Sequence, residues 1–373
     1  MRNYEPKPLF LERMSALLGS EINSYLEILK KFPVNSIRCN TLKISPDKLL
    51  NRLKSKNWVV EQPFKDAPEV MIIRGKIAKK NAVNNKDKLS DDKFGVETYN
   101  KNSSGWAGEQ FRETKLKNSQ REELRIGEEV ISLGPGEIGR SLEHLLGYYY
   151  VQEIASMLPV LALKPRPGEL VLDIAAAPGS KTTQIAAAMK NTGTIIANDV
   201  NLKRLKILAS NMERCGVVNS IITRRDGIAL CKRLKDAGFL FDKILVDAPC
   251  SGEGTLRSSP ITYQMWNIHT IKSLSKLQKG ILASALEILK IGGEIVYSTC
   301  THAPEENEEV VDFVLKNFDN IKIESISLPI KCRPGINKWL DSSYDKNVEK
   351  SCRIYPQDNN TEGFFIAKLR RVK

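Results

Sequence analysis

The back half of this 373-residue chain alternates short apolar runs with amphipathic helical patterns. The runs lie at residues 170–174, 194–199, 220–223, 243–247 and 294–299, and the helical patterns between them include 202–214 and 273–289. This alternation is typical of a parallel sheet with helices on both faces, because crossovers between parallel strands are long enough to hold a helix. Two later runs, at 321–327 and 363–369, can close the sheet. The pattern predicts an α/β, Rossmann-like doubly wound domain over residues 130–373.

A smaller α+β unit is predicted ahead of this domain, at residues 1–75. Apolar residues at helical spacing over 9–32 favour one helix, and Ser45 has the position of an N-cap for a second helix. Short strands are expected at 36–42, 58–60 and 70–73. Residues 76–129 are polar and basic, so we interpret them as an insertion or a linker between the two units.

The front of the chain carries an excess of positive charge. Residues 1–125 contain 25 basic and 16 acidic side chains, out of 57 and 44 in the whole chain. This excess indicates a polyanionic partner, above all a nucleic acid, although a Lys-rich solvated surface of the thermophilic kind is an alternative. No apolar run reaches the roughly 18 residues of a membrane-spanning helix, and the first residues lack a signal-peptide pattern. We therefore expect a cytoplasmic protein with no membrane partner.

The cysteines do not have the spacing of a metal site. Seven are scattered along the chain, at positions 39, 215, 231, 250, 300, 332 and 352. No CxxC or HExxH motif is present, so we predict that the protein holds no metal. In a chain of this size without a secretory signal the cysteines are expected to be reduced thiols, most of them buried as small apolar residues.

Small and acidic residues follow the strands of the predicted sheet, at the ends where such sheets bind ligands. A loop of small residues after the first strand allows close approach to the backbone, and an acid after the second can accept hydrogen bonds from ribose hydroxyls. The loop has neither the GxGxxG of dinucleotide sites nor the glycines of a P-loop, so S-adenosylmethionine, which has no phosphate, suits it better. Helix capping is the alternative role for the acids after the second and third strands. The residues expected to bind the cofactor are Ala175, Ala176, Ala177, Pro178, Gly179, Ser180, Lys181, Asp199, Asp226 and Asp247.

Two thiols follow the fourth and fifth strands. Cys250 stands in Asp247-Ala248-Pro249-Cys250-Ser251-Gly252, and Cys300 stands in Ser298-Thr299-Cys300-Thr301. These two strands are neighbours in the usual order of doubly wound methyltransferases, so we expect the thiols to lie close together beside Asp247. A buried inert pair or a chance disulfide is the alternative interpretation.

At this point the sequence closely resembles the Sun-domain family of RNA cytosine-5 methyltransferases, and within it the archaeal transfer RNA type. The likeness covers about residues 130–370 and extends loosely to an RNA-recognition-like unit at the front. Ser180 departs from the family pattern, which usually has a second glycine there. The motifs that carry the likeness occur in order, as Gln152-Glu153-Ile154-Ala155-Ser156-Met157, Ala175-Ala176-Ala177-Pro178-Gly179-Ser180-Lys181, the segment from Asp247 to Thr255, and Thr299-Cys300-Thr301.

The resemblance implies a covalent mechanism on cytosine. In the family, the cysteine that matches Cys300 adds to C6, and the one that matches Cys250 assists release of the product. Asp247 would hold the edge of the base and touch the cofactor, and Lys181 would lie near the catalytic centre and lower the pKa of the nucleophile. Sequence reasoning alone does not rank the two thiols, because DNA cytosine methyltransferases attack from a Pro-Cys pair. The base would be flipped or unpaired, and Arg257 with the basic front would bind phosphates.

Several substrates fit these expectations. Transfer RNA is favoured because no further RNA-binding module is seen after residue 369, and ribosomal RNA is the alternative. A DNA methyltransferase is the nearest rival enzyme. A non-catalytic RNA-binding assembly factor that keeps the cofactor fold is the rival from another class, although the intact cysteine motifs argue against it.

Overall fold

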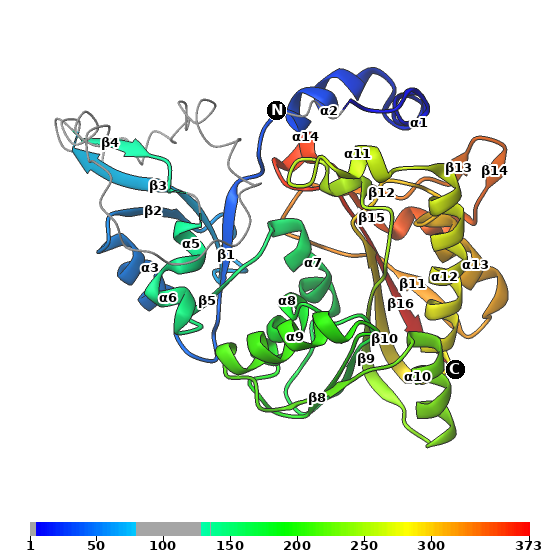
Figure 1. Ribbon diagram of the computed structural model, residues 1–373. Coiled ribbons are helices and arrows are strands. Elements are labelled where there is room, and N and C mark those ends of the chain that lie inside the picture. The colour runs from blue at the N-terminus through cyan, green and yellow to red at the C-terminus, as the bar shows by residue number, and fades with distance from the viewer. Residues whose placement is uncertain (1–4, 80–127, 135) are drawn as a thin grey trace.

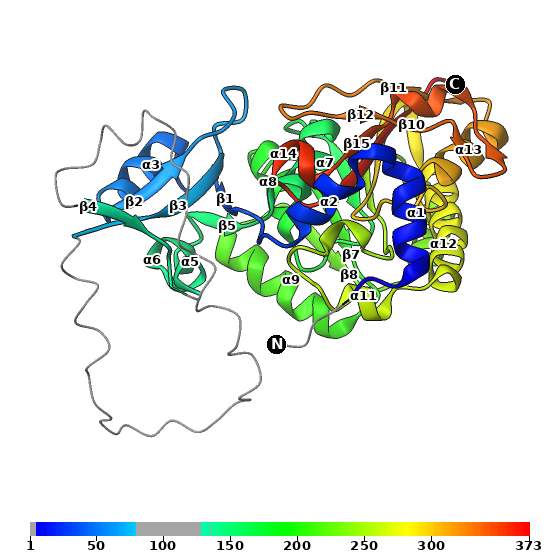
Figure 2. The same ribbon diagram turned by 90° about the horizontal axis from the view of Figure 1, so that it is seen from above.

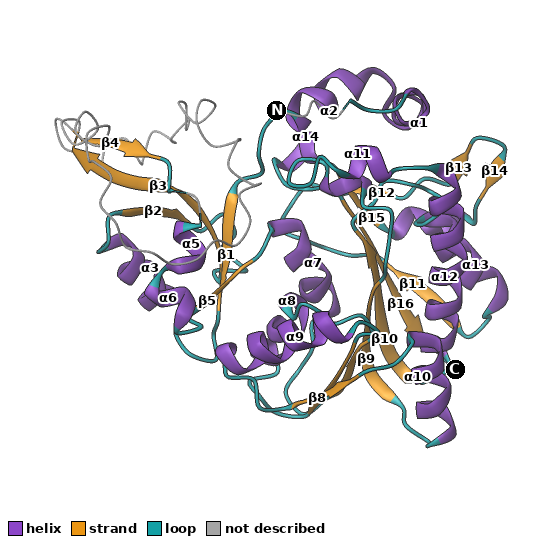
Figure 3. Ribbon diagram, viewed as in Figure 1, coloured by secondary structure: helices purple, strands orange, loops and turns teal. Residues whose placement is uncertain are grey.

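The structure is a computed structural model that describes residues 5–79, 128–134 and 136–373. Its described strands form a large sheet and a smaller one, with helices packed around both (Figures 1 and 3). A short hairpin, β13 (Lys338–Trp339) with β14 (Ser342–Ser343), completes the strands.

Nine of the described strands make up the large sheet, in the order β12-β15-β16-β10-β9-β6-β7-β8, with β11 also paired to β16. The strands from β10 to β8 are parallel, and β16 is antiparallel to β10, β11 and β15. The strand order changes direction between β6 and β9, which creates the switch point at which such sheets bind ligands. The bounds are β6 (Leu170–Asp173), β7 (Thr194–Asn198), β8 (Ser220–Thr223), β9 (Phe241–Asp247), β10 (Leu289–Thr299), β11 (Ile321–Glu324), β12 (Arg333–Pro334), β15 (Cys352–Ile354) and β16 (Phe364–Arg371).

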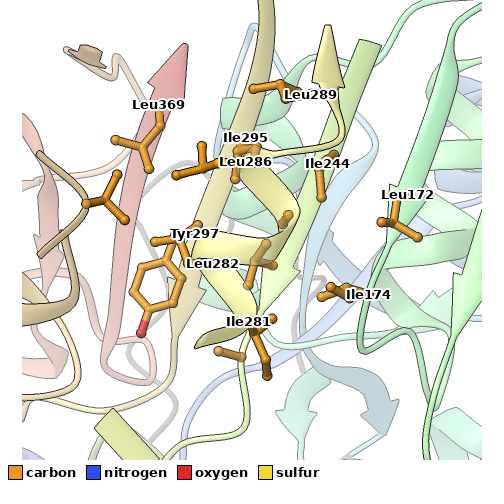
Figure 4. Packing of buried hydrophobic residues seen from close by; sticks show 14 of the residues in the cluster. Leu172, Ile174, Ile244, Ile281, Leu282, Leu286, Leu289, Ile295, Tyr297 and Leu369 are labelled. Atoms are coloured by element: carbon orange, nitrogen blue, oxygen red, sulfur yellow. The ribbon is translucent and has the colours of Figure 1, made fainter. Parts of the chain in front are cut away.

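Helices cover both faces of this sheet, which confirms the predicted α/β class. One face is covered by α7 (Ile154–Leu163), α8 (Ser180–Ala188) and α9 (Leu202–Cys215), and the other by α10 (Gly227–Asp236), α12 (Ile268–Leu286) and α13 (Glu308–Asn317) (Figure 1). Leu172 and Ile244 of the strands pack with Ile281 and Leu282 of α12 in the core of the second face (Figure 4). Burial of these side chains supplies the main driving force for folding.

The smaller sheet has the order β2-β3-β1-β5, with β4 paired to β3. Ser45 accepts a hydrogen bond from the Lys48 amide and caps α3, as the sequence predicted. The predicted insertion falls largely on residues 80–127, which lie outside the described residues. The bounds are β1 (Asn35–Cys39), α3 (Pro46–Lys54), β2 (Trp58–Glu61), β3 (Val70–Lys79), β4 (Glu128–Ile131), α5 (Glu137–Arg140), α6 (Leu142–Leu145) and β5 (Tyr149–Val151).

The structure divides the chain differently from the predicted boundaries at residues 75 and 129. The smaller sheet continues to β5, because this three-residue strand pairs with β1, and so short a strand leaves little trace in the sequence. The expected helix at 9–32 is two helices, α1 (Pro8–Leu18) and α2 (Ile22–Leu29), separated at Gly19 by a 3₁₀ turn. Both pack on the back half, against residues that include Trp266 and Tyr355 (Figure 2).

A buried arginine joins the smaller sheet to the back half. Arg38 of β1 is 2% exposed, and its guanidinium donates to the Ser180 carbonyl at 2.6 Å and to Thr183 Oγ1 at 2.7 Å, both in α8. It also donates to the Gln152 side chain. Since α8 follows the small-residue loop directly, Arg38 ties the front unit to the predicted cofactor loop.

Two cysteines correct the prediction that all seven are reduced thiols. Cys332 and Cys352 form a disulfide, with their Cα atoms 5.3 Å apart. The physical reason is that β12 pairs with β15, which brings together residues that are 20 positions apart in the sequence. Cys39, Cys215 and Cys231 are buried, as predicted. The remaining short helices of the back half are η3 (Glu253–Thr255), α11 (Thr262–Met265), η4 (Lys346–Lys350) and α14 (Pro356–Asn359).

Within the described ranges no helix is both long and apolar enough to cross a membrane. The same residues contain no group of three or more His, Cys, Asp or Glu side chains that could hold a metal ion.

Candidate active site

A cavity of about 220 Å³ lies at the carboxyl ends of β6 and β9, at the switch point of the sheet. Most residues of the predicted cofactor loop line this cavity, together with Asp247. A larger cavity of about 660 Å³ lies elsewhere and includes none of the predicted site residues, so we assign the chemistry to the smaller one. The smaller cavity is lined by Ser156, Asp173, Ala175, Ala176, Ala177, Pro178, Ser180, Lys181, Arg204 and Asp247.

The loop before α8 gives the cavity a wall of backbone and small side chains. Gly179 has φ +104°, a backbone conformation that favours glycine, and a Cβ atom there would lie close to Leu208 Cδ1, at 3.0 Å. No side chain caps the N-terminus of α8, which begins at Ser180. Its first amide groups therefore remain available for an anionic group of a ligand, such as the carboxylate of methionine.

Asp173, which the sequence analysis did not name as a site residue, lines the cavity at the end of β6. It is 1% exposed, and Thr182 Oγ1 donates to its Oδ2 at 2.7 Å. Its Oδ1 is buried with no hydrogen-bond partner among the described residues. Burial raises the pKa of this carboxyl to about 7. A cationic ligand group would satisfy both the unpaired oxygen and the buried charge, and S-adenosylmethionine carries an ammonium and a sulfonium.

Lys181 and Asp247 form an ion pair beside the same cavity. Lys181 Nζ lies 2.8 Å from Asp247 Oδ2 and donates to Ser156 Oγ at 2.9 Å. Ser298 Oγ donates to the other oxygen of Asp247 at 2.8 Å. Lys181 is only 8% exposed and lies over the ring of Phe364, so its ammonium group is held inside the site and not in solvent.

The two thiols that follow β9 and β10 lie close together. Cys250 Sγ and Cys300 Sγ are 3.2 Å apart, within hydrogen-bond distance, and both residues are partly exposed. The hydrogen bond with Cys300 and burial together raise the pKa of the Cys250 thiol well above its usual value. Cys250 therefore keeps its proton and can donate it toward the sulfur of Cys300.

The predicted acids after the second and third strands have different positions. Asp199 is 2% exposed, accepts from the Asn201 amide and pairs with Arg204 at 3.2 Å. It is not the cap of α9, because Asn201 has that role. Asp226 is exposed and caps α10 by accepting from the Ala229 amide, which is the capping role of the alternative interpretation.

The structure changes the expected role of one residue and adds a role for another. Arg257 was expected to bind phosphate, but it is 2% exposed and donates to the carbonyl oxygens of Lys31, Phe32 and Thr361. Its guanidinium therefore serves the packing of α2 against the back half. Asn198, which the sequence analysis passed over, donates to the carbonyls that follow β6 and β8 and thereby holds those loops together.

Comparison with known proteins shows the family of the chain. The family model described as "16S rRNA methyltransferase RsmB/F" matches residues 160–370. A tRNA (cytosine(49)-C(5))-methyltransferase from Pyrococcus abyssi is 46% identical over 235 residues, which are 63% of this chain and 74% of that protein. The chain belongs to this family. Its members transfer a methyl group from S-adenosylmethionine to C5 of cytosine in RNA, and the chain is an enzyme of this class.

Other relatives and solved structures resemble the chain as well. Ribosomal RNA small subunit methyltransferase F from Vibrio cholerae is 40% identical over 238 residues, and the chain spans only about half of the length of that protein, 48%. The crystal structure of NSun6 from Pyrococcus horikoshii with SFG is 28% identical, covers 98% of both chains and has a TM-score of 0.73. A methyltransferase homolog protein from the same organism is 30% identical over 99% of this chain and 96% of that one, also with a TM-score of 0.73.

Proposed function

We propose that the enzyme methylates C5 of cytosine in transfer RNA. The choice of transfer RNA as substrate rests on the 46% identity with a transfer RNA methyltransferase over 74% of the length of that protein. The proposed chemistry rests on the pair of thiols 3.2 Å apart, in the loops that follow β9 and β10, because β9 ends at Asp247, which lines the cavity. Ribosomal RNA is the second candidate, because the matching family model bears a ribosomal RNA description.

Cys300 is the proposed nucleophile and Cys250 its partner. The Cys300 thiolate adds to C6 of cytosine, which forms the S–C6 bond and moves the electrons of the C5=C6 bond to C5. Bound S-adenosylmethionine would supply the methyl group that C5 takes and would be left as S-adenosylhomocysteine. A base then accepts the C5 proton, and the electrons of the C5–H bond restore C5=C6 as the S–C6 bond breaks. The protonated Cys250 thiol stabilises the departing Cys300 thiolate through their hydrogen bond, and its raised pKa supports this order of roles.

Asp247 and Lys181 are proposed to orient the reactants. One oxygen of Asp247 is fixed by Lys181 and the other by Ser298, so the carboxylate is held at the rim of the cavity, where it can receive the polar edge of the base. The loop at 175–181 and the first amides of α8 would hold the methionine part of the cofactor. Asp199 would hold the ribose, and Asp226 is a further proposed contact of the cofactor.

The front unit is proposed to bind RNA through its basic surface. Lys48, Lys54 and Lys65 are exposed there. Affinity should fall steeply with salt, because phosphate contacts release counterions. Deletion of residues 1–75 is a poor test of this proposal, since α1 and α2 pack on the back half. Replacement of the three exposed lysines by glutamate should weaken RNA binding and leave cofactor binding unchanged. We also propose that the enzyme works in the cytoplasm.

The substrate is tested with the purified enzyme, S-adenosylmethionine and two RNAs, a transfer RNA transcript pool and 16S ribosomal RNA fragments. Bisulfite sequencing reads the cytosines that become resistant to conversion. We expect resistance in transfer RNA with the wild-type enzyme and none with Cys300→Ala. If cytosines become resistant to conversion in ribosomal RNA alone, the substrate is ribosomal RNA and the transfer RNA proposal is wrong. Methylation of a DNA of the same sequence would contradict the RNA class.

A further inference from the structure

The two cysteine loops are joined by direct hydrogen bonds. The Cys250 loop is defined as residues 248–254 and the Cys300 loop as residues 300–307. The Gly254 amide donates to the Cys300 carbonyl at 2.9 Å, and a Cβ atom at Gly254 would lie only 2.9 Å from that same carbonyl oxygen. Ser251 Oγ and Thr301 Oγ1 share a hydrogen bond of 2.8 Å. The loops are therefore docked tightly, with no room for a side chain at their closest approach.

A buried carboxylate reaches from the Cys250 loop to the Cys300 loop. Glu253 is 3% exposed, and its Oε2 accepts from Thr301 Oγ1 at 3.1 Å and from the His302 amide at 3.2 Å. Its Oε1 accepts from Trp266 Nε1 at 2.7 Å. Burial raises the pKa of this carboxyl. The hydrogen bonds offset the cost of placing a carboxylate away from water.

A second carboxylate reaches in the opposite direction. Glu306 of the Cys300 loop is fully buried, and its Oε2 accepts from the Ser251 amide at 3.0 Å and from Gln278 Nε2 at 2.8 Å. Gln278 Nε2 also donates to the Pro249 carbonyl at 2.7 Å, so the backbone on both sides of Cys250 is held. Burial raises the pKa of Glu306 to about 7. Its Oε1 has no hydrogen-bond partner among the described residues.

Both carboxylates lie outside the lining of the cofactor cavity, and neither forms a hydrogen bond with a thiol among the described residues. The negative charge of Glu306 also contributes to the raised pKa of the Cys250 thiol. Each carboxylate accepts hydrogen bonds from the loop that carries the other cysteine. A buried acid that serves packing alone is costly compared with an apolar side chain of similar volume. We propose that Glu253 and Glu306 are positioning residues, a reciprocal pair of carboxylates that keeps Cys250 within hydrogen-bond distance of Cys300, so that release of the methylated RNA depends on them.

This proposal rests on the cysteine roles proposed above, so its test begins with a measurement that does not. Diamide oxidises the free protein, and mass spectrometry of the peptides follows formation of a Cys250–Cys300 disulfide. The wild-type thiols, 3.2 Å apart, should join readily. In Glu306→Ala the rate should fall about tenfold, the equivalent of one lost hydrogen bond to a charged group. Glu306→Gln, whose amide oxygen can accept from Ser251, should recover most of the rate.

The second measurement is turnover on RNA. Glu306→Ala should lower kcat about tenfold, accumulate a protein–RNA adduct on denaturing gels and leave cofactor affinity unchanged. Glu305→Ala is the matched control, because Glu305 is the neighbouring residue in the same loop but pairs with Arg13 and Trp339 instead of the Cys250 loop. Its rate of disulfide formation with diamide and its kcat on RNA should both match those of the wild type.

Different failures have different meanings. If folded Glu306→Ala oxidises at the wild-type rate and forms no excess adduct, the carboxylate is structural and the proposal is wrong. If oxidation slows as expected but Cys250→Ala forms no adduct, the positioning stands and the proposed cysteine roles fall. If a melting curve shows that Glu306→Ala does not fold, Thr301→Val takes its place, because it removes the hydroxyl that contacts both Ser251 and Glu253. A wild-type oxidation rate in folded Thr301→Val then overturns the proposal.

Discussion

Asp173 should make cofactor affinity depend on pH. Its carboxyl lines the cavity with one oxygen unpaired, and burial raises its pKa to about 7. With that value, roughly one-tenth of the molecules carry the charge at pH 6 and roughly nine-tenths at pH 8. A cationic ligand group favours the ionised form. If the ionised form alone binds well, affinity rises roughly tenfold from pH 6 to pH 8.

The assay is calorimetric titration with S-adenosylhomocysteine at pH 6, 7 and 8, in two buffers of different ionisation enthalpy. Below pH 7 binding should release close to one proton. Asp173→Asn keeps a hydrogen-bond acceptor for Thr182 and should bind more weakly, with no change across this range. The charged neighbours Lys181 and Asp247 are present in both proteins, so the comparison isolates Asp173. A flat wild-type profile, or the same slope in Asp173→Asn, would refute the reasoning.

The same carboxyl should affect stability in the opposite sense. Its folded-state pKa of about 7 lies above the ordinary value of 3.8, so the folded state binds the proton more tightly than the unfolded state. The stabilising contribution is fully present below about pH 4 and is lost as pH rises through 7. The melting temperature of Asp173→Asn should therefore rise relative to that of the wild type as pH rises through this window.

Three further predictions follow from the site and the disulfide. Cys250→Ala should accumulate a cofactor-dependent protein–RNA adduct on denaturing gels, whereas Cys300→Ala should form none; the reverse pattern would make Cys250 the nucleophile. Asp199→Ala should lower cofactor affinity at least about tenfold by calorimetry, because charge-assisted hydrogen bonds to the ribose are lost; unchanged affinity would reduce Asp199 to a partner of Arg204. Cys332→Ser should lower the free energy of unfolding by about 3 kcal/mol in denaturant titrations under oxidising conditions, since the disulfide closes a loop of 20 residues; equal stability would show that the bond is not formed in solution.

The parts of the fold that the sequence predicted are those with local causes. The five parallel strands follow from apolar runs, and the start of α3 follows from the capping geometry of Ser45. The approach of Cys250 to Cys300 was also predictable, because both follow neighbouring parallel strands and so meet at one edge of the sheet.

The parts that were missed depend on contacts between distant segments. Arg257 was expected to face RNA, but it donates to the carbonyl oxygens of Lys31 and Phe32, which follow α2 and are more than 200 positions away in the sequence. Asp173 ends a strand as many aspartates do, and its unpaired oxygen becomes visible only when the cavity is assembled. Glu306 follows Cys300 closely, yet only the folded loops show that it anchors Ser251.

The bond between Arg38 and α8 bears on how such enzymes can be engineered. A chimaera that exchanges the front unit to redirect methylation toward another RNA also exchanges the cation that holds the Ser180 carbonyl and the Thr183 hydroxyl. A donor unit with an apolar side chain at this place removes the guanidinium from both groups, and only the hydrogen bonds of Thr183 Oγ1 to the Gly179 and Ser180 carbonyls remain there. We therefore expect that an exchange of the front unit has to keep Arg38 together with its partners Gln152 and Thr183.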